Sequence, residues 1–426
     1  MTSEHVILAQ SSFTLQGIQK KMEHNVVDTA WDSLFSNRPL TPDFVDLTIG
    51  APGPELLCNL PPIFLRATKH RMENDQGNLF QYGPETGISA FKQELANFLS
   101  RRYGDRPVTK EELLTTCGAT SGIQLAATVL LDRKGVVFVE DPTYFISLSI
   151  LCKDLGFKVV PVPMTEEGID VSELEKAVLK EREGIVSQSD RYWAMVYTIP
   201  NFHNPTGVTM SPERGRKLIE LASGENMLVV CDDVYNLLSY SPVPFSRLRA
   251  LQQDHDHCVI SNGTFSKILA PGVRLGWIEA SPHIVARLAN SGFLQSGGSM
   301  NNLTSGIATS LISLGLLDEQ LDHCKEVYGA RMAAALKELT LLPAGWSVES
   351  PGGGYFLWIK AERDLSAFCR KIEENGVAVL PGSRASSSQS PQSCNNAIRI
   401  SIAYFTEEKI ALACKTIVKL ACDFVM

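Results

Sequence analysis

Lys267 has the surroundings that most clearly favour chemistry in this chain. It follows two hydroxyl side chains, Thr264 and Ser266, and precedes Arg274 within a stretch that is otherwise apolar and rich in glycine. A lysine removed from water has a lowered pKa and can act as an amine nucleophile or form an imine with an aldehyde. The two hydroxyls and the arginine are suited to a phosphate ester. Pyridoxal 5′-phosphate carries both an aldehyde and a phosphate, so we expect Lys267 to bind it.

A carboxylate suited to the same cofactor follows the apolar segment 227–231. Asp232 stands where a parallel strand would end, and ligands of α/β proteins bind at that end of the strands. Pyridoxal phosphate needs a carboxylate at its ring nitrogen, because the protonated ring accepts electrons. Tyr235 could donate to the phenolic oxygen of the cofactor. Taken alone, Asp232 or Asp233 would more often be a helix cap, but together with Lys267 the cofactor role is favoured.

Two turn segments could complete the cofactor site. Asn204 begins an Asn-Pro-Thr-Gly sequence, which is a good turn, and its amide could also bind the phenolic oxygen. Residues 117–122 join a strand to a helix, and their small side chains would let backbone N–H groups at the helix N-terminus converge on an anion. The segment lacks the lysine of a P-loop. Ala119 and Thr120 would then share the phosphate with Arg274 and the hydroxyls near it.

Three more side chains have a candidate role. Tyr144 follows Asp-Pro-Thr, and its ring could stack on a planar cofactor or pack in the core. Arg399 interrupts the apolar alternation of residues 398–402, so it could bind a substrate carboxylate or form a structural salt bridge. Tyr82 lies in the glycine-bounded loop 81–87 and could reach a phosphate, from its own or another subunit.

The segments that must position these residues alternate between two patterns. From about residue 113 to residue 280, short apolar runs typical of buried strands alternate with longer amphipathic runs typical of helices. This alternation predicts an α/β fold with a mainly parallel sheet covered on both faces. Ser211 followed by Pro212 marks a helix start. The expected strands are 113–116, 136–140, 158–163, 193–200, 228–232 and 259–262, and the expected helices include 122–131, 144–155, 171–180 and 212–223.

The C-terminal part has a different pattern, which predicts a smaller α+β domain. Residues 383–396 are rich in Ser, Gln and Asn and are expected to form a loop. The expected helices are 320–339, 365–374 and a last one from 407, and the expected strands are 346–348, 355–359, 377–380 and 398–404. No internal repeat is visible, so a large and a small lobe are the expected organisation.

The composition argues against several classes of protein. The chain has 426 residues, 44% of them hydrophobic and 20% charged, which is too long for one simple core. A net charge of −8 without a basic run argues against nucleic-acid binding. Ten cysteines without a CxxC pair predict reduced thiols, with no metal site. The first 21 residues lack a signal-peptide pattern and no apolar run could span a bilayer, so we expect a cytoplasmic protein without a membrane partner.

The motifs occur in an order that resembles one enzyme family. The chain resembles the fold type I pyridoxal-phosphate enzymes, specifically the class I/II aminotransferases, and within them the branch of 2-aminoadipate and kynurenine aminotransferases. The resemblance covers roughly residues 46–404. Its motifs are individually modest but jointly specific. They are Gly118-Ala119-Thr120, Asp141-Pro142-Thr143-Tyr144, Asn204-Pro205-Thr206-Gly207, Asp232 with Tyr235, Ser266-Lys267, Arg274 and Arg399.

The resemblance implies a role for each candidate residue. Lys267 would form the internal aldimine with pyridoxal 5′-phosphate, Asp232 would pair with the ring nitrogen, and Tyr144 would stack on the ring. The remaining implied cofactor contacts are Asn204 and Tyr235 at the phenolic oxygen, and Ala119, Thr120, Thr264, Ser266 and Arg274 at the phosphate. The implied substrate contacts are Arg399, Gly50 and Asn204. Tyr82 would reach the phosphate of the neighbouring subunit's cofactor, which implies a homodimer with shared active sites.

The resemblance also implies the architecture. The family has a large domain with a mostly parallel seven-stranded sheet and a smaller α+β domain. We therefore expect a large cofactor-binding domain over residues 50–311, and a small domain built from residues 1–49 and 312–426.

The implied activity is pyridoxal-phosphate-dependent transamination, with Lys267, Asp232 and Tyr235 as catalytic residues. The substrate amine would displace Lys267, and the freed lysine would then act as the base for the Cα proton. The amino group of an aromatic, 2-aminoadipate or long aliphatic L-amino acid would pass to a 2-oxo acid such as 2-oxoglutarate. The sequence shows no clear second arginine for a distal carboxylate, which leaves the substrate open.

Two other activities use the same cofactor-binding residues. A carbon–sulfur β-lyase or a decarboxylase would differ in which substrate bond is broken, and the motifs do not separate these outcomes from transfer. A non-catalytic regulator that binds pyridoxal phosphate is less favoured, because the fold is expected to begin near the N-terminus and no basic helix is visible.

Overall fold

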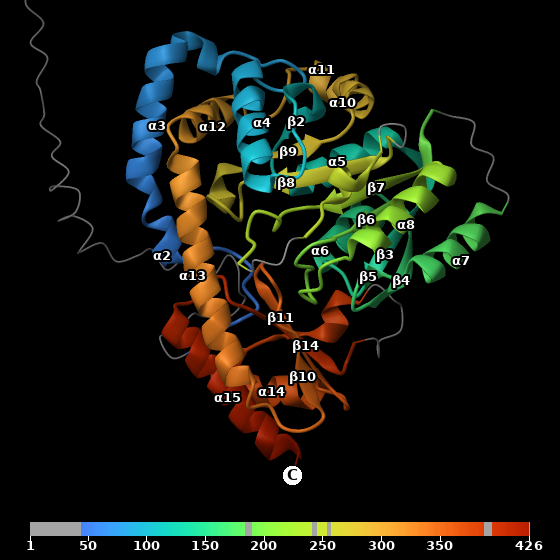
Figure 1. Ribbon diagram of the computed structural model, residues 1–426, viewed down its shortest axis with the longest axis vertical. Helices are drawn as coiled ribbons and strands as arrows, with labels where there is room; N and C mark the ends of the chain where they lie inside the picture. Colours follow the sequence, from blue (N-terminus) through green and yellow to red (C-terminus); the bar gives the residue numbers. More distant parts are fainter. Residues whose placement is uncertain (1–43, 184–189, 241–244, 254–256, 387–393, 426) are drawn as a thin grey trace, which may run out of the picture. The chain divides into compact units, whose positions relative to one another are not determined.

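A large twisted sheet forms the centre of the computed structural model of this chain (Figure 1). The structure describes residues 44–183, 190–240, 245–253, 257–386 and 394–425. The strands of this sheet lie in the order β2-β9-β8-β7-β6-β3-β4-β5. Their bounds are β2 Leu113–Thr116, β3 Leu131–Asp141, β4 Lys158–Thr165, β5 Gly168–Ile169, β6 Tyr192–Thr198, β7 Met227–Asp232, β8 Val259–Thr264 and β9 Gly276–Glu279.

Most of the sheet is parallel, which confirms the predicted α/β fold. The pairs β3–β4, β3–β6, β6–β7 and β7–β8 are parallel, whereas β9 is antiparallel to both of its neighbours, β2 and β8. The two-residue strand β5 extends the edge beyond the seven expected strands by an antiparallel turn from β4. The six strands predicted from the apolar runs are all present, and β9 is an additional one.

The two faces of the sheet are covered by different helices. Alternate residues of β7 belong to two separate apolar clusters, with Leu228 and Val230 in one and Val229 and Cys231 in the other. Side chains of α5 and α10 join the first cluster, and side chains of α7 and α8 join the second. A strand buried on both faces needs apolar residues at nearly every position, which explains the continuous apolar runs. The helices are α5 Ala119–Leu130, α7 Val171–Arg182, α8 Pro212–Gly224 and α10 Pro282–Ala289.

Local signals account for some helix starts and not for others. Helix α8 begins as predicted, because the Ser211 side chain accepts a hydrogen bond from the Arg214 backbone at 3.3 Å. The predicted helix 144–155 is instead a short α-helix, α6 (Phe145–Leu148), that continues as the π-helical η4 (Ser149–Asp154). The remaining elements before residue 314 that follow β7 are α9 Leu248–Leu251, η5 Pro271–Val273, α11 Gly292–Gln295 and α12 Asn302–Ser313.

The C-terminal part contains the second, antiparallel sheet, in the order β10-β11-β14-β13. This sheet and the helices around it match the α+β organisation predicted for this part of the chain (Figure 1). The predicted strand 377–380 divides into β12 and β13, which pair with different partners. The elements are α13 Leu316–Leu339, β10 Trp346–Val348, β11 Phe356–Ala361, α14 Ser366–Glu374, β12 Val377–Ala378, β13 Leu380–Pro381, η6 Gly382–Ala385, β14 Ala397–Ser401 and α15 Glu407–Val425.

A segment from early in the chain joins this C-terminal part. Strand β1 (Val45–Asp46) pairs in parallel with β12, and Val45 lies opposite Val377. The other early elements are α2 Pro54–Leu57, α3 Leu60–Asp75, η2 Gln76–Phe80, α4 Ser89–Tyr103 and η3 Lys110–Glu112. The expected domain boundaries stay a prediction, and most of the expected N-terminal contribution, residues 1–43, lies outside the described residues.

Candidate active site

Lys267 lies three residues beyond the end of β8, at the carboxyl edge of the parallel strands. Its amine donates to the Gly50 carbonyl at 2.9 Å. The rings of Tyr235 and Tyr355 have their centres 6.0 and 5.6 Å from the same nitrogen. Burial, together with the positive charges of Arg399 and Arg274, lowers the pKa of Lys267 to about 8, although Asp232 acts in the opposite direction. The residue is therefore a lysine whose amine can lose its proton near neutral pH.

Asp232 ends β7 and is buried, with 4% of its surface exposed. One carboxylate oxygen accepts a hydrogen bond from the Tyr197 hydroxyl at 2.7 Å, and the other accepts one from the Asn262 amide at 3.3 Å. Burial raises the pKa of Asp232 to about 6, and these two donors oppose the rise. The group is still mostly ionised at neutral pH, as a partner of a protonated ring nitrogen must be.

Groups that could bind an anion surround the N-terminus of α5. Gly118 precedes the helix with a φ of 86°, and no side chain of the described residues caps the helix there. A Cβ atom on Gly118 would lie 3.4 Å from an Arg274 guanidinium nitrogen and 3.7 Å from the Thr264 hydroxyl. The Thr264 hydroxyl in turn donates to the Ser266 hydroxyl at 3.0 Å. A helix N-terminus, a guanidinium and two hydroxyls thus meet at one glycine, which suits a phosphate group.

The predicted phosphate residues are brought together by this arrangement. Ala119 and Thr120 are the first two residues of α5, directly after Gly118. Arg274 also donates to the Cys117 carbonyl, at 3.3 Å. The pairing of β9 with β2 and β8 brings the segment around Arg274 beside the start of α5. Gly276 lies so close to Gly118 that no larger residue would fit there.

Arg399 is a buried guanidinium on β14, with 4% of its surface exposed. It donates to the Asn204 side-chain oxygen at 2.9 Å and to the Thr48 carbonyl at 2.7 Å, and it lies 4.1 Å above the Phe356 ring. Burial lowers the pKa of Arg399 to about 10. Its Nε is buried and has no hydrogen-bond partner among the described residues. A buried guanidinium that keeps an unused donor can bind a carboxylate ligand in a fork.

With one exception, the other predicted residues lie around Lys267, Asp232, Gly118 and Arg399. Asn204 is held by Arg399, and Tyr235 packs against the rings of Tyr355 and Phe356 at 5.3 and 5.8 Å. Tyr144 is close enough to Asp232 and Arg399 for their charges to affect its pKa, which burial raises to about 12. A Cβ atom on Gly50 would lie 2.9 Å from the Phe356 ring.

Tyr82 is the exception. It is 81% exposed, its ring lies beside Gly297, and it makes none of the site contacts given above. The structure of the single chain therefore brings the predicted residues together without Tyr82.

Several residues of the site were not predicted from the sequence. Tyr197 and Asn262 hold Asp232, Ser147 donates to the Tyr197 hydroxyl at 2.9 Å, and the Tyr355 hydroxyl donates to the Lys267 carbonyl at 3.0 Å. A polar residue near the carboxyl end of an apolar strand is the signal that Tyr197 and Asn262 offered. That signal becomes specific only when the face of the strand is known.

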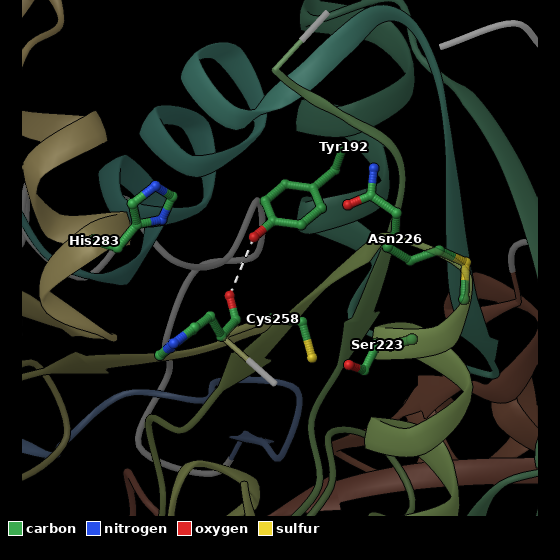
Figure 2. Close-up of a pocket in the computed structure, with 8 residues that line it drawn as sticks. Tyr192, Ser223, Asn226, Cys258 and His283 are labelled. Carbon is green, nitrogen blue, oxygen red and sulfur yellow. Dashed lines mark hydrogen bonds between the residues drawn. The ribbon is translucent and has the colours of Figure 1, made fainter. Parts of the chain in front are cut away.

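A pocket of about 340 Å³ lies at the other end of the central strands, where β6, β7 and β8 begin (Figure 2). Its lining includes Tyr192, Met227 and Cys258, at or just before the amino ends of β6, β7 and β8, together with residues of α8 and α10. The Tyr192 hydroxyl donates to the His257 carbonyl there at 3.1 Å. None of the residues that line this pocket belongs to the predicted site. The candidate active site is therefore at the carboxyl edge of the strands, where ligands of α/β proteins bind.

The described residues contain neither a membrane-spanning helix nor a metal-binding cluster. No described helix is both long and apolar enough to cross a membrane. Within the same ranges, no group of three or more His, Cys, Asp or Glu residues could hold a metal ion.

Comparison with known proteins agrees with the site. The model of the family described as aminotransferase class I and II matches residues 42–417. The chain is 34% identical over 375 residues to aromatic-amino-acid aminotransferase 1 of Thermococcus litoralis, which covers 87% of this chain and 86% of that protein.

Solved structures give the same result for the fold. A kynurenine aminotransferase from Pyrococcus horikoshii, in complex with PMP, superposes with a TM-score of 0.79 at 27% identity and covers 96% of this chain and 97% of that one. An α-aminoadipate aminotransferase from Thermus thermophilus, complexed with N-(5′-phosphopyridoxyl)-L-leucine, has a TM-score of 0.74 at 25% identity and covers 95% and 97% of the two chains.

The residues of this chain fit the cofactor of that family. The buried amine of Lys267, the buried carboxylate of Asp232 and the guanidinium and hydroxyl groups at Gly118 are the kinds of partner that the aldehyde, ring nitrogen and phosphate of pyridoxal 5′-phosphate require. The match to the family model covers most of the chain. The chain belongs to the class I and II aminotransferases and is a transferase that depends on pyridoxal 5′-phosphate.

Proposed function

We propose that this aminotransferase moves the amino group of an aromatic, 2-aminoadipate or long aliphatic L-amino acid to a 2-oxo acid such as 2-oxoglutarate, with Lys267 as the covalent anchor of the cofactor. The observation that carries the proposal is the buried amine of Lys267, which lies within the electrostatic range of Asp232, Arg274 and Arg399. These are the partners that a ring nitrogen, a phosphate and a substrate carboxylate require.

Lys267 and Asp232 have separate tasks in this proposal. When bound, pyridoxal phosphate supplies an acceptor for the electrons that remain when the substrate Cα loses its proton. Asp232, held ionised by two donors, keeps the ring nitrogen protonated. Lys267, once its amine is free, takes the Cα proton, and its lowered pKa suits a base that works near neutral pH.

Arg399 and the aromatic residues beside it support an amino-acid substrate. The unused Nε of Arg399 faces no described partner, and the α-carboxylate of the substrate would take this place. The rings of Tyr235, Tyr355 and Phe356 pack against one another between Arg399 and Lys267, which favours substrates with an apolar side chain. The activities named for the relatives, on aromatic amino acids, kynurenine and α-aminoadipate, agree with this range.

Arg384 could provide positive charge for a second carboxylate. It lies in η6, with its guanidinium 5.5 Å from the Phe145 ring, and its charge affects the pKa of Arg399. The neighbouring backbone is fixed to the loop before α6, because the Thr143 N–H donates to the Ala385 carbonyl at 2.8 Å. A dicarboxylic acceptor such as 2-oxoglutarate fits two guanidinium groups of this kind better than a monocarboxylate does.

A screen of amino donors with 2-oxoglutarate tests the proposed reaction. The purified protein, loaded with pyridoxal phosphate, would be incubated with aromatic, acidic and aliphatic L-amino acids, and the products measured. We expect glutamate and the matching 2-oxo acid from one or more donors of the proposed range. Formation of pyruvate and ammonia, or of carbon dioxide and an amine, would instead support a lyase or a decarboxylase, and cofactor binding without any turnover would support a regulator.

A further inference from the structure

Asp232 lies at the end of a chain of buried hydroxyl groups. The Tyr197 hydroxyl donates to the Asp232 carboxylate at 2.7 Å, and the Ser147 hydroxyl donates to the Tyr197 hydroxyl at 2.9 Å. Ser147, Tyr197 and Asp232 are all buried, with exposed fractions of 0%, 0% and 4%. Water therefore does not compete for these hydrogen bonds, and each donor acts at full strength on the next group.

The register of the sheet explains why these residues meet. Met195 and Tyr197 of β6 lie in the same apolar cluster as Leu228 and Val230 of β7, and Tyr197 pairs with Val230. Because side chains alternate along a strand, Asp232 points to the same face as Val230 and therefore toward Tyr197. Asn262 of β8 pairs with Asp232 of β7 and points to the same face. The Asn262 amide donates to the Asp232 carboxylate at 3.3 Å and to the Ala119 carbonyl of α5 at 2.9 Å, so it links Asp232 to this helix.

Ser147 connects this chain of groups to a second part of the site. It lies in α6, three residues after Tyr144, the aromatic residue proposed to stack on the cofactor ring. The hydrogen bonds from Ser147 through Tyr197 to Asp232 therefore link α6 to the end of β7. The same bonds would fix the stacking residue and the ring-nitrogen partner relative to each other.

We infer that Tyr197, supported by Ser147, is a positioning residue that keeps Asp232 ionised and aimed at the ring nitrogen of the cofactor. The inference rests on the proposed role of Asp232. A carboxylate can stabilise a protonated ring nitrogen only while it is ionised, and a buried carboxylate without donors takes up a proton instead. The Tyr197 hydroxyl supplies the shorter of its two side-chain hydrogen bonds.

The surroundings of Asp232 explain why this donor matters. Burial raises the pKa of Asp232 to about 6, and the hydrogen bond from Tyr197 acts against the rise more strongly than the bond from Asn262 or the charge of Lys267. The neighbouring carboxylate of Asp233 raises the pKa further. The titratable and polar groups that act on Asp232 are Tyr197, Asp233, Asn262, Lys267, Tyr144 and Tyr235. With the pKa close to neutrality, the loss of one donor changes the fraction of ionised Asp232 at pH 7.

The test compares the pH dependence of cofactor binding in the whole protein and in three variants. The dissociation constant for pyridoxal phosphate would be measured from pH 5 to pH 9 in the wild type, Tyr197→Phe, Ser147→Ala and Tyr192→Phe. Tyr192→Phe is the matched control, because it removes a tyrosine hydroxyl that donates a hydrogen bond from the same strand, at the opposite edge of the sheet (Figure 2). The ionisations of free pyridoxal phosphate are common to all four proteins, so only differences between the curves report on Asp232.

As the pH falls, we expect Tyr197→Phe to lose affinity about one pH unit earlier than the wild type, because a hydrogen bond to a charged group has about this strength. Between the two midpoints, the variant should bind pyridoxal phosphate about tenfold more weakly than the wild type. Ser147→Ala should shift the curve in the same direction by less, since Tyr197 keeps its bond to Asp232. Tyr192→Phe should leave the curve unchanged.

A curve for Tyr197→Phe that matches the wild type, or an equal shift in Tyr192→Phe, would overturn the inference. If Tyr197→Phe does not fold, a Ser147→Ala curve identical to the wild type would overturn it as well. Failure of the wild type to bind pyridoxal phosphate at any pH would contradict the proposed function itself. Binding with identical curves in all variants would contradict only the role of Tyr197.

Discussion

Lys267 and Asp232 share one buried site, and burial shifts the pKa of both groups toward neutrality, to about 8 and about 6. Each shift means that the charged form costs free energy when the site holds no ligand. The shifted groups have the properties that the reaction needs, a base that loses its proton easily and a carboxylate with strong donors. We therefore expect these two residues to lower the stability of the cofactor-free protein.

Replacement of Lys267 by Met should stabilise the cofactor-free protein at pH 7, on the order of 1–3 kcal/mol. The folded-state pKa of about 8 lies below the ordinary value of 10.5, so the unfolded chain binds the proton more tightly. Below pH 8 both states are protonated and the whole cost of burying the charge is present. Between pH 8 and pH 10.5 only the unfolded chain keeps its proton, so the stability of the wild type rises with pH and the advantage of the variant disappears.

Chemical denaturation at several pH values measures this difference in the free energy of unfolding. Lys217→Met is a suitable control, because the Lys217 side chain is 62% exposed, and a change of less than about 0.5 kcal/mol is expected there. An advantage of Lys267→Met that does not change between pH 7 and pH 10.5 would contradict the assigned pKa shift.

At the scale of elements, the helix α5 and the glycine before it hold the proposed phosphate site. Gly118→Ala should weaken the binding of pyridoxal phosphate by more than about tenfold, because the new Cβ would crowd the anion site beside Arg274 and Thr264 and the backbone φ of 86° disfavours any side chain. The dissociation constant of the cofactor, measured by titration of the cofactor-free protein, tests this prediction.

Gly156→Ala is the matched control for the backbone effect. Gly156 also has a positive φ, of 72°, but an added Cβ would meet no atom within 4 Å. Both substitutions should lower the free energy of unfolding by about 1–2 kcal/mol, and only Gly118→Ala should change cofactor affinity. Equal cofactor affinities of the two variants would contradict the position of the phosphate site.

Local patterns predicted most elements because the apolar runs of the central strands reflect burial on both faces. The bounds of β2 and β10 match the predicted ranges. Lys267 and Arg399 were identified as candidates from their neighbouring residues, and Asp232 from its place after an apolar run together with Lys267. Strand β9 was missed, because Gly276–Glu279 has only two apolar residues, between a glycine and a glutamate, and shows no apolar run. The predicted strand 377–380 was divided because its two halves pair with β1 and β14, and no local pattern specifies such long-range partners.

The same limit applies to the site. Tyr197 and Asn262 lie in apolar strands, and their contacts with Asp232 depend on the pairing of β6, β7 and β8. The sequence alone does not specify this pairing. Of the hydrogen-bonded residues, only the charged Asp232 was therefore recognised as a candidate.

At the scale of the whole molecule, we propose a homodimer in which Tyr82 completes the site of the partner subunit. The single chain leaves Tyr82 81% exposed, although the other predicted site residues come together within it. Phe80, two residues earlier, is also exposed, at 67%. Large exposed aromatic side chains of this kind are typical of surfaces that bind another protein.

Complementation between two variants tests this shared site. Lys267→Ala and Tyr82→Ala would each have low activity, but a mixed dimer would contain one site with both native residues. Coexpression of the two variants should give about a quarter of the wild-type activity, because random pairing places half of the chains in mixed dimers with one intact site each. Activity no higher than the mean of the separate variants, or a monomeric mass by light scattering, would contradict the shared site.

In the proposed reaction, Lys267 carries out the proton transfer of an amino-group transfer, and the half-reaction with a single amino donor tests this role most directly. The protein loaded with pyridoxal phosphate would be mixed with the best donor of the screen and no acceptor, and the released 2-oxo acid would be counted. We predict about one 2-oxo acid per wild-type site and at least a thousandfold slower release from Lys267→Ala, since general-base catalysis and positioning are both lost. Release from Lys267→Ala at the wild-type rate, or no release from the wild type with any donor, would contradict the account.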